Sequence, residues 1–271
     1  MKKQTLPLLL LAALLAACTT KPQPVPQQPP ASVPAATTPE PPKTTEPAQP
    51  PAPKVDPIQA MGWYESDIGY PMKSDDPKAV GLKVAMLTFD DGPTKDVTPQ
   101  ILDVLKREKI RAIFFVTGYG IEQAPDMLKR IAAEGHIIAV HTMTHPDLAT
   151  LSQAEQRKEI VPVIAKVKEL TGITPTYIRP PFGSYNKDLL ALCKELGLTV
   201  TTWSNGSLDW DRLDSNGHKD PQKVVDSVLE QLTPGSNILM HDTHQHTADA
   251  LPTLIKSLRD KGYQFVTLGK G

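Results

Sequence analysis

The chain has 271 residues, 28 of them prolines, and a formal net charge of −1. Half of the prolines lie in the 39 residues from Thr19 to Pro57, which have almost no aromatic or large aliphatic side chains and cannot bury enough apolar surface to offset the entropy of ordering. Composition therefore excludes a packed core there and predicts a disordered tether over residues 18–57. Residues 58–271 carry 24 basic against 27 acidic side chains with no basic block, which suits one domain and excludes the charge pattern of a nucleic-acid-binding protein.

The first 17 residues have the pattern of a signal peptide. Two lysines are followed by a ten-residue apolar run from Leu6 to Leu15, which is too short to span a bilayer. The sequence Leu-Ala-Ala-Cys18 resembles the lipobox of bacterial lipoproteins, which implies cleavage before Cys18 and acylation of its side chain. The residue after Cys18 is Thr19, whereas an Asp at this position would resemble inner-membrane sorting. This favours a lipid anchor in the outer membrane at the periplasmic face. Ordinary secretion with a free Cys18 is the alternative.

Further along the chain, short β-rich runs alternate with helical patterns. The expected strands are Lys83–Phe89, Ala112–Thr117, His136–Val140, Thr176–Ile178, Thr199–Trp203, Asn237–Met240 and Gln264–Leu268. The expected helices are Thr98–Glu108, Ala124–Glu134, Gln153–Thr171, Lys187–Leu196, Pro221–Leu232 and Ala248–Lys261. Seven such units favour an α/β fold with a parallel sheet closed, or nearly closed, into a (β/α) barrel. A doubly wound open sheet is the alternative, but it would usually show a Gly-rich turn after the first strand, where this chain has Asp90-Asp91-Gly92-Pro93.

Polar clusters follow five of the expected strands. They are Asp90-Asp91-Gly92-Pro93, His141-Thr142-Met143-Thr144-His145, Arg179-Pro180-Pro181-Phe182-Gly183, Asp209-Trp210 and His241-Asp242. In α/β barrels the chemistry is built on the loops that leave the carboxyl ends of the strands. The positions of these clusters therefore predict one active site at that end of the barrel.

The first two clusters together suggest a metal centre. His141 and His145 can face one cation if the segment after the strand turns helically, and a carboxylate from the neighbouring loop completes a three-ligand site with open positions. Adjacent carboxylates point in different directions, so one can bind the metal while the other takes a proton from bound water. Each motif alone is a weak signal, and their occurrence at two strand ends is what favours the site.

The five clusters in this order closely resemble the polysaccharide deacetylases with a NodB-type domain, carbohydrate esterase family 4. The resemblance covers roughly Val84 to Leu268. It implies a distorted (β/α) barrel and a metal-dependent hydrolysis that removes N-acetyl, or sometimes O-acetyl, groups from a glycan. It further implies that Asp91, His141 and His145 bind the metal, usually zinc, with cobalt or another divalent ion also possible. Asp90 resembles the general base, and Arg179 the residue that orients it.

The remaining clusters resemble the acid side of such a site. His241 is similar to the general acid that protonates the leaving amine, and Asp209 to the carboxylate that supports it. The backbone N–H of Phe182 resembles a donor to the developing oxyanion. Trp210 and Leu239 resemble the lining of the pocket for the acetyl methyl.

Five further residues fit structural roles better than chemical ones. We expect His244 and His246 to be solvated loop residues, since neither belongs to a motif. His136 begins a strand at the end away from the chemistry, which favours a structural role. Asp242 is expected to hold its loop, and Cys193, inside an apolar helical pattern, to be an inert buried thiol.

The leading hypothesis is a deacetylase of an N-acetylglucosamine-containing glycan, with peptidoglycan favoured by the expected periplasmic location. Chitin oligosaccharide, poly-N-acetylglucosamine and acetylxylan are alternative substrates. One departure from the family pattern, Gly206 in place of a common Asp, bears on the shape of the sugar subsites. Two alternatives from other classes are a glycan-binding lipoprotein without turnover and a non-haem iron oxygenase, because two histidines and a carboxylate also form that enzyme's triad.

Overall fold

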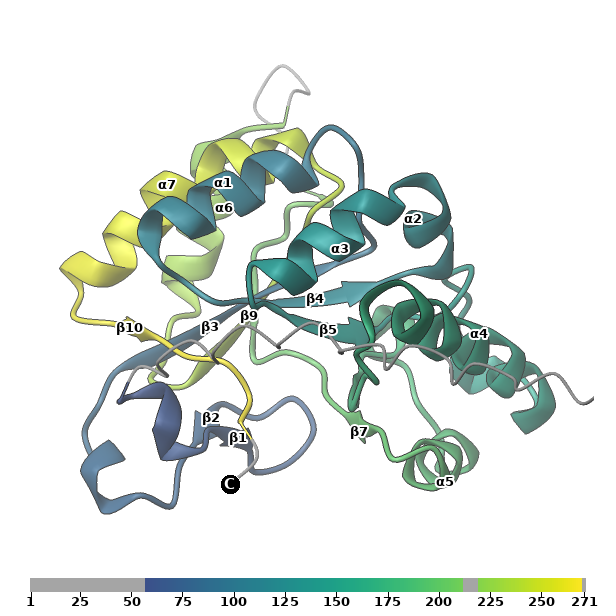
Figure 1. Ribbon diagram of the computed structural model, residues 1–271. Helices are drawn as coiled ribbons and strands as arrows, with labels where there is room; N and C mark the ends of the chain where they lie inside the picture. Colours follow the sequence, from purple (N-terminus) through teal and green to yellow (C-terminus); the bar gives the residue numbers. More distant parts are fainter. Residues whose placement is uncertain (1–56, 212–218, 270–271) are drawn as a thin grey trace, which may run out of the picture. The chain divides into compact units, whose positions relative to one another are not determined.

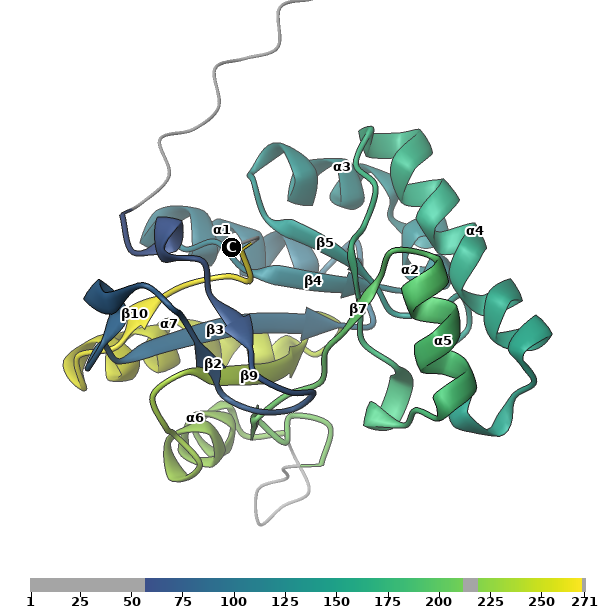
Figure 2. The ribbon, with the colours of Figure 1, turned by 90° about the horizontal axis from the view of Figure 1, so that it is seen from below.

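The computed structural model describes residues 57–211 and 219–269 (Figures 1 and 2). The predicted signal peptide, Cys18 and all of the tether except Pro57 lie outside the described residues. Among the helices that are described, none is long and apolar enough to cross a membrane.

One parallel sheet organises the domain. Its strands are β3 (Val84–Asp90), β4 (Ile113–Val116), β5 (Ile137–Val140), β6 (Tyr177–Ile178), β7 (Thr199–Val200), β8 (Asn205–Gly206) and β9 (Ser236–His241). They follow the order β7-β6-β5-β4-β3-β9-β8, and every pairing is parallel. A further strand, β10 (Gln264–Phe265), pairs with the start of β3. The predicted α/β fold with about seven parallel strands is confirmed.

The sheet curls strongly, as chain length alone requires. Strands β7 and β8 lie at opposite ends of the strand order, yet only five peptide units separate Val200 from Asn205. Five units span at most about 18 Å, whereas the edges of a flat seven-stranded sheet would lie about 29 Å apart. The sheet is therefore a half-barrel whose two edge strands are bridged by residues 201–204.

Helices cover the outer side of this half-barrel (Figure 1). They are α1 (Thr98–Glu108), α2 (Gly118–Gln123), α3 (Pro125–Ala133), α4 (Gln153–Thr171), α5 (Lys187–Glu195), α6 (Pro221–Glu230) and α7 (Gln245–Asp260). Local signals explain several ends. Ser152 and Glu155 form a capping box at the start of α4, and Gly172, with φ of 73°, ends it.

Strand β3 shows how the two faces of the sheet differ. Leu87 and Phe89 point outward into the core beneath the helices. Met86 points inward and packs with Phe115 of β4 in a second core. Further along the inner face come Thr88 and Asp90, so the barrel interior changes from apolar to polar toward the carboxyl ends of the strands.

The inner core is closed by the segment before β3. Strands β1 (Tyr64–Glu65) and β2 (Met72–Lys73) form a small antiparallel hairpin, and the side chain of Met72 joins the inner core. The N–H of Met72 donates to the carbonyl of Gly235, just before β9, at 2.7 Å. Trp63, also in this core, bridges to Leu268. This segment adds elements that the sequence pattern did not predict.

Several predicted boundaries were wrong. The strand expected over Thr199–Trp203 ends at Val200, because the chain leaves the sheet there to cross to β8. Strand β10 ends at Phe265 rather than Leu268. Helix α7 begins at Gln245, three residues before its predicted start. Helix α2 was not predicted, since its six residues include two glycines.

Candidate active site

A cavity of about 400 Å³ opens at the carboxyl ends of the strands. It is lined by Asp90, Asp91, His141, His145, Phe182, Trp203, Trp210, Leu239 and His241. The structure thus brings together residues from β3 and β9 and from the loops after β3, β5, β6, β7 and β8. Two further residues singled out from the sequence, Arg179 and Asp209, are fully buried directly behind its wall.

Three side chains offer a metal site. One ligand atom from each of Asp91, His141 and His145 lies within 4.8 Å of the other two. The Oδ1 atom of Asp91 is 3.4 Å from the Nε2 atom of each histidine. This oxygen is buried and accepts no hydrogen bond among the described residues. A buried carboxylate oxygen facing two imidazole nitrogens fits a divalent cation such as zinc.

The histidines meet through a turn and not through the helical segment that we expected. Thr142 and His145 both adopt positive φ angles, 69° and 63°. Glu159 of α4 stabilises the turn by accepting from the N–H groups of Met143 and Thr144 at 2.9 and 2.8 Å. Nothing in the sequence signals this role of Glu159, because the contact joins a loop to a distant helix.

The metal-facing nitrogen of His141 is set by the surroundings of its ring. The Nδ1 atom of His141 lies 2.7 Å from the carbonyl oxygen of Arg179, which leaves Nε2 as the unprotonated nitrogen on the cavity side. Burial lowers the pKa of His141 to about 3, so its imidazole is neutral at physiological pH, the form that binds metals.

Asp90 and Arg179 form a buried ion pair under the cavity. Asp90 is 2% exposed and Arg179 is 0% exposed. The Nη1 group of Arg179 donates to Oδ1 of Asp90 at 2.7 Å and to the hydroxyl of Thr88 at 2.8 Å. The guanidinium also stacks 4.1 Å above the ring of Phe115. Burial raises the pKa of Asp90, although Arg179 and His241 oppose the rise. A carboxylate in this environment accepts a proton more readily than one in water.

His241 and Asp209 form a second pair on the opposite wall. Nδ1 of His241 lies 2.7 Å from Oδ1 of Asp209, and the backbone N–H of His241 donates to Oδ2 at 2.8 Å. Burial would lower the pKa of His241, but the bond and charge of Asp209 outweigh it and raise this pKa to about 9. The same bond holds the pKa of Asp209 at about 2, against the effect of burial. His241 is therefore an imidazolium whose Nε2–H faces the cavity.

Asp209 is held by residues that sequence reasoning missed. Thr247 donates its hydroxyl proton to Oδ2 of Asp209 at 2.7 Å. His246 lies 2.5 Å, through Nε2, from the carbonyl oxygen of Asp209 and is buried in α7. The prediction that His246 is a solvated loop residue was wrong, because α7 begins earlier than expected. His244, just before α7, is half-buried and contacts His246 and His241.

The rim of the cavity carries aromatic side chains. Phe182 is 68% exposed, and its ring packs on the edge of His145. Its backbone lies in a tight turn with φ of 60°; the oxyanion role of its N–H stays a prediction. Trp210, 44% exposed, stands edge-on to His241. Leu239 forms the buried floor, and Trp203 lines the cavity although the sequence suggested only a strand there.

Asp242 holds the loop that carries Asp91. Its carboxylate accepts from the N–H of Gly92 at 3.0 Å and from the hydroxyl of Thr98 at 2.6 Å. A Cβ atom on Gly92 would lie 2.2 Å from this carboxylate, so only glycine fits there. These contacts agree with the expected holding role of Asp242.

His136 and Cys193 have the structural positions that the sequence favours, whereas the effect of Gly206 on subsite shape stays a prediction. The buried ring of His136 accepts a hydrogen bond from the N–H of Ala112 at 3.1 Å. Cys193 is a free buried thiol whose pKa is raised to about 12 by burial. Gly206 lies on β8, where the amide of Gln231 bonds both its N–H and its carbonyl oxygen. A Cβ atom on Gly206 would meet only ordinary contacts, so space does not require the glycine.

Comparison with known proteins places this geometry in context. A family model described as Polysaccharide deacetylase matches residues 78–201. The chain is 40% identical over 192 residues to the peptidoglycan-N-acetylglucosamine deacetylase PgdA of Listeria monocytogenes, covering 71% of this chain but 39% of that protein. It is 35% identical over 187 residues to the peptidoglycan-N-acetylmuramic acid deacetylase PdaA of Bacillus subtilis, covering 69% of this chain and 70% of that protein.

A solved structure gives the same result for the fold. The crystal structure of the Bc1960 peptidoglycan N-acetylglucosamine deacetylase, in complex with an N-hydroxybenzamide compound, matches with a TM-score of 0.65 at 37% sequence identity. The match covers 69% of this chain and 87% of that one.

Proposed function

Because the chain belongs to the polysaccharide deacetylase family, we propose that it hydrolyses N-acetyl groups on a glycan built from N-acetylglucosamine. The observation that carries the proposal is one cavity with a buried carboxylate of raised pKa on one side and an imidazolium on the other. Asp90 and His241 are these two groups. Amide hydrolysis needs this pair, because water must lose a proton and the leaving nitrogen must gain one.

The reaction follows from the positions of the side chains. Asp90 takes a proton from the water that attacks the acetyl carbonyl, while Arg179 keeps the carboxylate oriented. His241 then gives its Nε2 proton to the amine as the carbon–nitrogen bond breaks, so the products are acetate and a free amine. Without that proton the amine would leave as an anion, which is a far poorer leaving group. Asp209 orients the ring of His241 and stabilises its imidazolium form.

The metal site completes the chemistry. We assign Asp91, His141 and His145 as the residues that would hold a divalent cation, with zinc the best match to their donor atoms. Such a cation lowers the pKa of bound water and polarises a carbonyl oxygen. The N–H of Phe182 is proposed as a second donor to that oxygen. Leu239 and Trp210 are proposed to enclose the acetyl methyl group.

Peptidoglycan is the proposed substrate. Support comes from relatives whose names specify N-acetylglucosamine or N-acetylmuramic acid residues of peptidoglycan. A chitooligosaccharide deacetylase of Bradyrhizobium, which is 34% identical, keeps chitin oligosaccharides as the second candidate. The class of substrate, an acetylated amino sugar, is the same in both cases.

An acetate-release assay tests the function. Purified protein would be incubated with peptidoglycan, chitin oligosaccharides, poly-N-acetylglucosamine and acetylxylan, after loading with zinc or cobalt and, in parallel, after chelation. We expect acetate from the amino-sugar polymers, loss of release on chelation and recovery when metal returns. Failure on every polymer, with identical behaviour of the metal-free form, would contradict the proposal.

The same assay separates the two other classes of function. If the protein binds the glycan without turnover, the wild-type protein and the Asp90→Asn variant should bind the polymer equally well. Neither of them should release acetate. An iron oxygenase would contain iron after purification and consume oxygen. The deacetylase reading alone gives the proton donor His241 a task.

We further propose that Cys18 carries a lipid anchor at the periplasmic face of the outer membrane. The lipobox-like sequence before Cys18 and the Thr that follows it support this proposal.

The proline-rich segment up to Pro57 would then let the enzyme reach the wall, since 39 residues in extended polyproline form span about 120 Å at most. Cys18→Ala should move the protein out of the membrane fraction. Shortening the segment should reduce deacetylation of the wall in cells but not of soluble oligosaccharides.

A further inference from the structure

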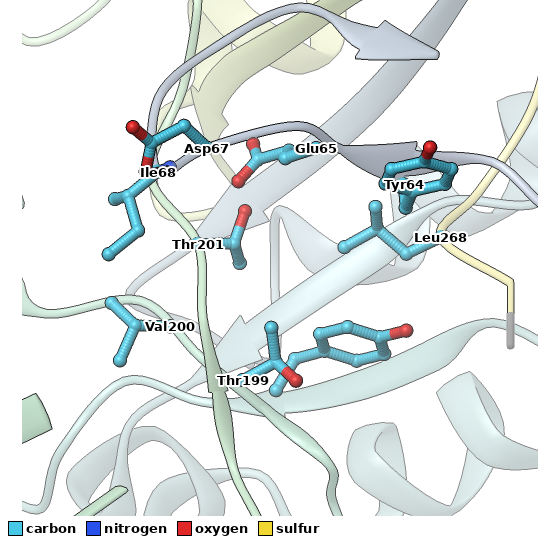
Figure 3. A pocket seen from close by; sticks show the side chains of 9 residues that line it. Tyr64, Glu65, Asp67, Ile68, Thr199, Val200, Thr201 and Leu268 are labelled. Atoms are coloured by element: carbon cyan, nitrogen blue, oxygen red, sulfur yellow. Dashed lines mark hydrogen bonds between the residues drawn. The ribbon is translucent and has the colours of Figure 1, made fainter. Parts of the chain in front are cut away.

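A second cavity lies on the side of the half-barrel closed by the β1–β2 hairpin. It has a volume of about 290 Å³ and is lined by Tyr64, Glu65, Asp67, Ile68, Tyr177, Thr199, Val200, Thr201 and Leu268. Figure 3 shows the carboxylate of Glu65 reaching from the hairpin toward the hydroxyl of Thr201. Glu65 precedes the stretch that the deacetylase family model matches, which begins at residue 78.

Glu65 is the entry to a chain of hydrogen bonds that ends at the active site. Its Oε1 atom accepts from the Nδ2 group of Asn237 at 2.5 Å. The Oδ1 atom of the same amide accepts from Nη2 of Arg179 at 3.2 Å. The second terminal nitrogen of that guanidinium, Nη1, donates to Asp90 at 2.7 Å. Two side chains therefore connect Glu65 to Asp90.

This chain permits only one orientation of the Asn237 amide. Its Nδ2 group is shared by two acceptors, Glu65 and the carbonyl oxygen of Thr202 at 2.9 Å. Its Oδ1 faces a donor that cannot become an acceptor, since a guanidinium has only N–H groups. Turning the amide over would place an N–H against the N–H of Arg179 and oxygen against the carboxylate of Glu65.

Burial makes the arrangement matter. Asn237 and Arg179 are fully buried, so a hydrogen bond lost here cannot be replaced by bulk water. Arg179 is fixed on one side by Asp90 and Thr88 and on the other by Asn237 and Thr202. If the Asn237 amide loses its bond to Glu65, it holds Arg179 less firmly. The guanidinium can then shift, and its hydrogen bond to Asp90 changes.

We propose that Glu65 is a positioning residue for the reaction, acting through Asn237 on Arg179. It touches neither the cavity with the metal ligands nor any atom that reacts. The inference rests on the proposed catalytic role of Asp90. Its consequence is that the β1–β2 hairpin is part of the catalytic apparatus and not only a lid on the inner core.

Three substitutions separate contact from charge. Glu65→Gln keeps the length and an oxygen that can accept from Asn237, so kcat should stay within about threefold of wild type. Glu65→Asp keeps the charge but is one methylene too short, and Glu65→Ala removes both. For Glu65→Asp and Glu65→Ala we expect kcat to fall about tenfold, the usual effect of losing a residue that supports a catalytic group. KM and zinc affinity should stay within about twofold of wild type. Asp67→Asn, in the same hairpin and cavity, is the matched control and should change nothing.

A double-mutant cycle with Asn237→Ala completes the test. If Glu65 acts through the amide, adding Glu65→Asp to Asn237→Ala should lower kcat no further. Three outcomes would each overturn the inference. They are a wild-type kcat in Glu65→Asp, a loss of kcat in Glu65→Gln as large as in Glu65→Asp, and fully additive losses in the double variant. Should Glu65→Ala fail to fold, the Gln and Asp variants still decide between these outcomes. Absence of acetate release from the wild-type protein would instead refute the proposed function, and the inference that rests on it would fall with it.

Discussion

The two walls of the active-site cavity hold histidines in opposite charge states. His141, on the wall made by β3 and β5, has a pKa lowered to about 3 because burial disfavours its charged form. His241, on the wall made by β8 and β9, is also largely buried, yet its bond to Asp209 raises its pKa to about 9. Burial is common to both residues, and the largest difference between them is the partner of Nδ1, with the charges of Asp90 and Asp91 also raising the pKa of His241. A carbonyl oxygen beside Nδ1 leaves the imidazole of His141 neutral, and a carboxylate beside Nδ1 keeps His241 protonated.

The largest expected effect comes from the first wall. Asp91→Asn replaces the carboxylate that faces both histidines with a neutral amide, which is a weaker metal ligand. We expect zinc binding to fall and acetate release to drop by about a thousandfold or more, since a bound cation contributes several kcal/mol to such reactions. Metal content by mass spectrometry and acetate release together check this. Full metal occupancy with normal activity would show that the first wall is not the metal site.

The second wall should lose activity without losing metal. Asp209→Asn removes the charge that keeps His241 protonated and fixes its tautomer. We expect acetate release to fall about a hundredfold, in line with the loss of one general acid. Zinc content should equal that of wild type. A parallel loss of metal and activity would mean that the two walls do not act separately.

The pair on the second wall also predicts how stability depends on pH. The pKa of folded His241, about 9, lies above the ordinary value of 6.5. Its contribution is therefore fully present below pH 6.5 and is lost as pH rises through 9. In metal-free protein this loss should amount to about 3 kcal/mol.

Denaturant unfolding of wild type and Asp209→Asn measures that contribution. Both proteins would be chelated and unfolded between pH 6 and pH 10. The stability gap between them should close as pH rises, because groups other than His241 titrate alike in both. A gap that stays constant across this range would contradict the raised pKa.

The walls themselves could be predicted from the sequence because their residues follow strands. Asp90 and His241 each end a strand, and alternation of strands and helices was enough to bring those ends together. Among the supports behind the walls, Arg179 and Asp209 also follow strands, but Glu65, Asn237 and Thr247 could not be predicted in this way. Glu65 and Asn237 are 172 positions apart, and a two-residue strand such as β1 leaves no periodic signal. Thr247 was missed because helix α7 begins at Gln245, before the apolar pattern that predicted its start at Ala248.

The smallest expected effect concerns the aromatic rim of the second wall. Trp210 stands edge-on to His241, with ring centroids 5.4 Å apart, and forms no hydrogen bond to it. It supplies contact area and no charge, so Trp210→Ala should raise KM about three- to tenfold, the equivalent of a lost aromatic contact. The value of kcat should change less than threefold, and Trp210→Phe should recover most of the loss. If kcat fell as far as in Asp209→Asn, the ring would be needed to hold the imidazolium itself, and the second wall would work through packing as much as through charge.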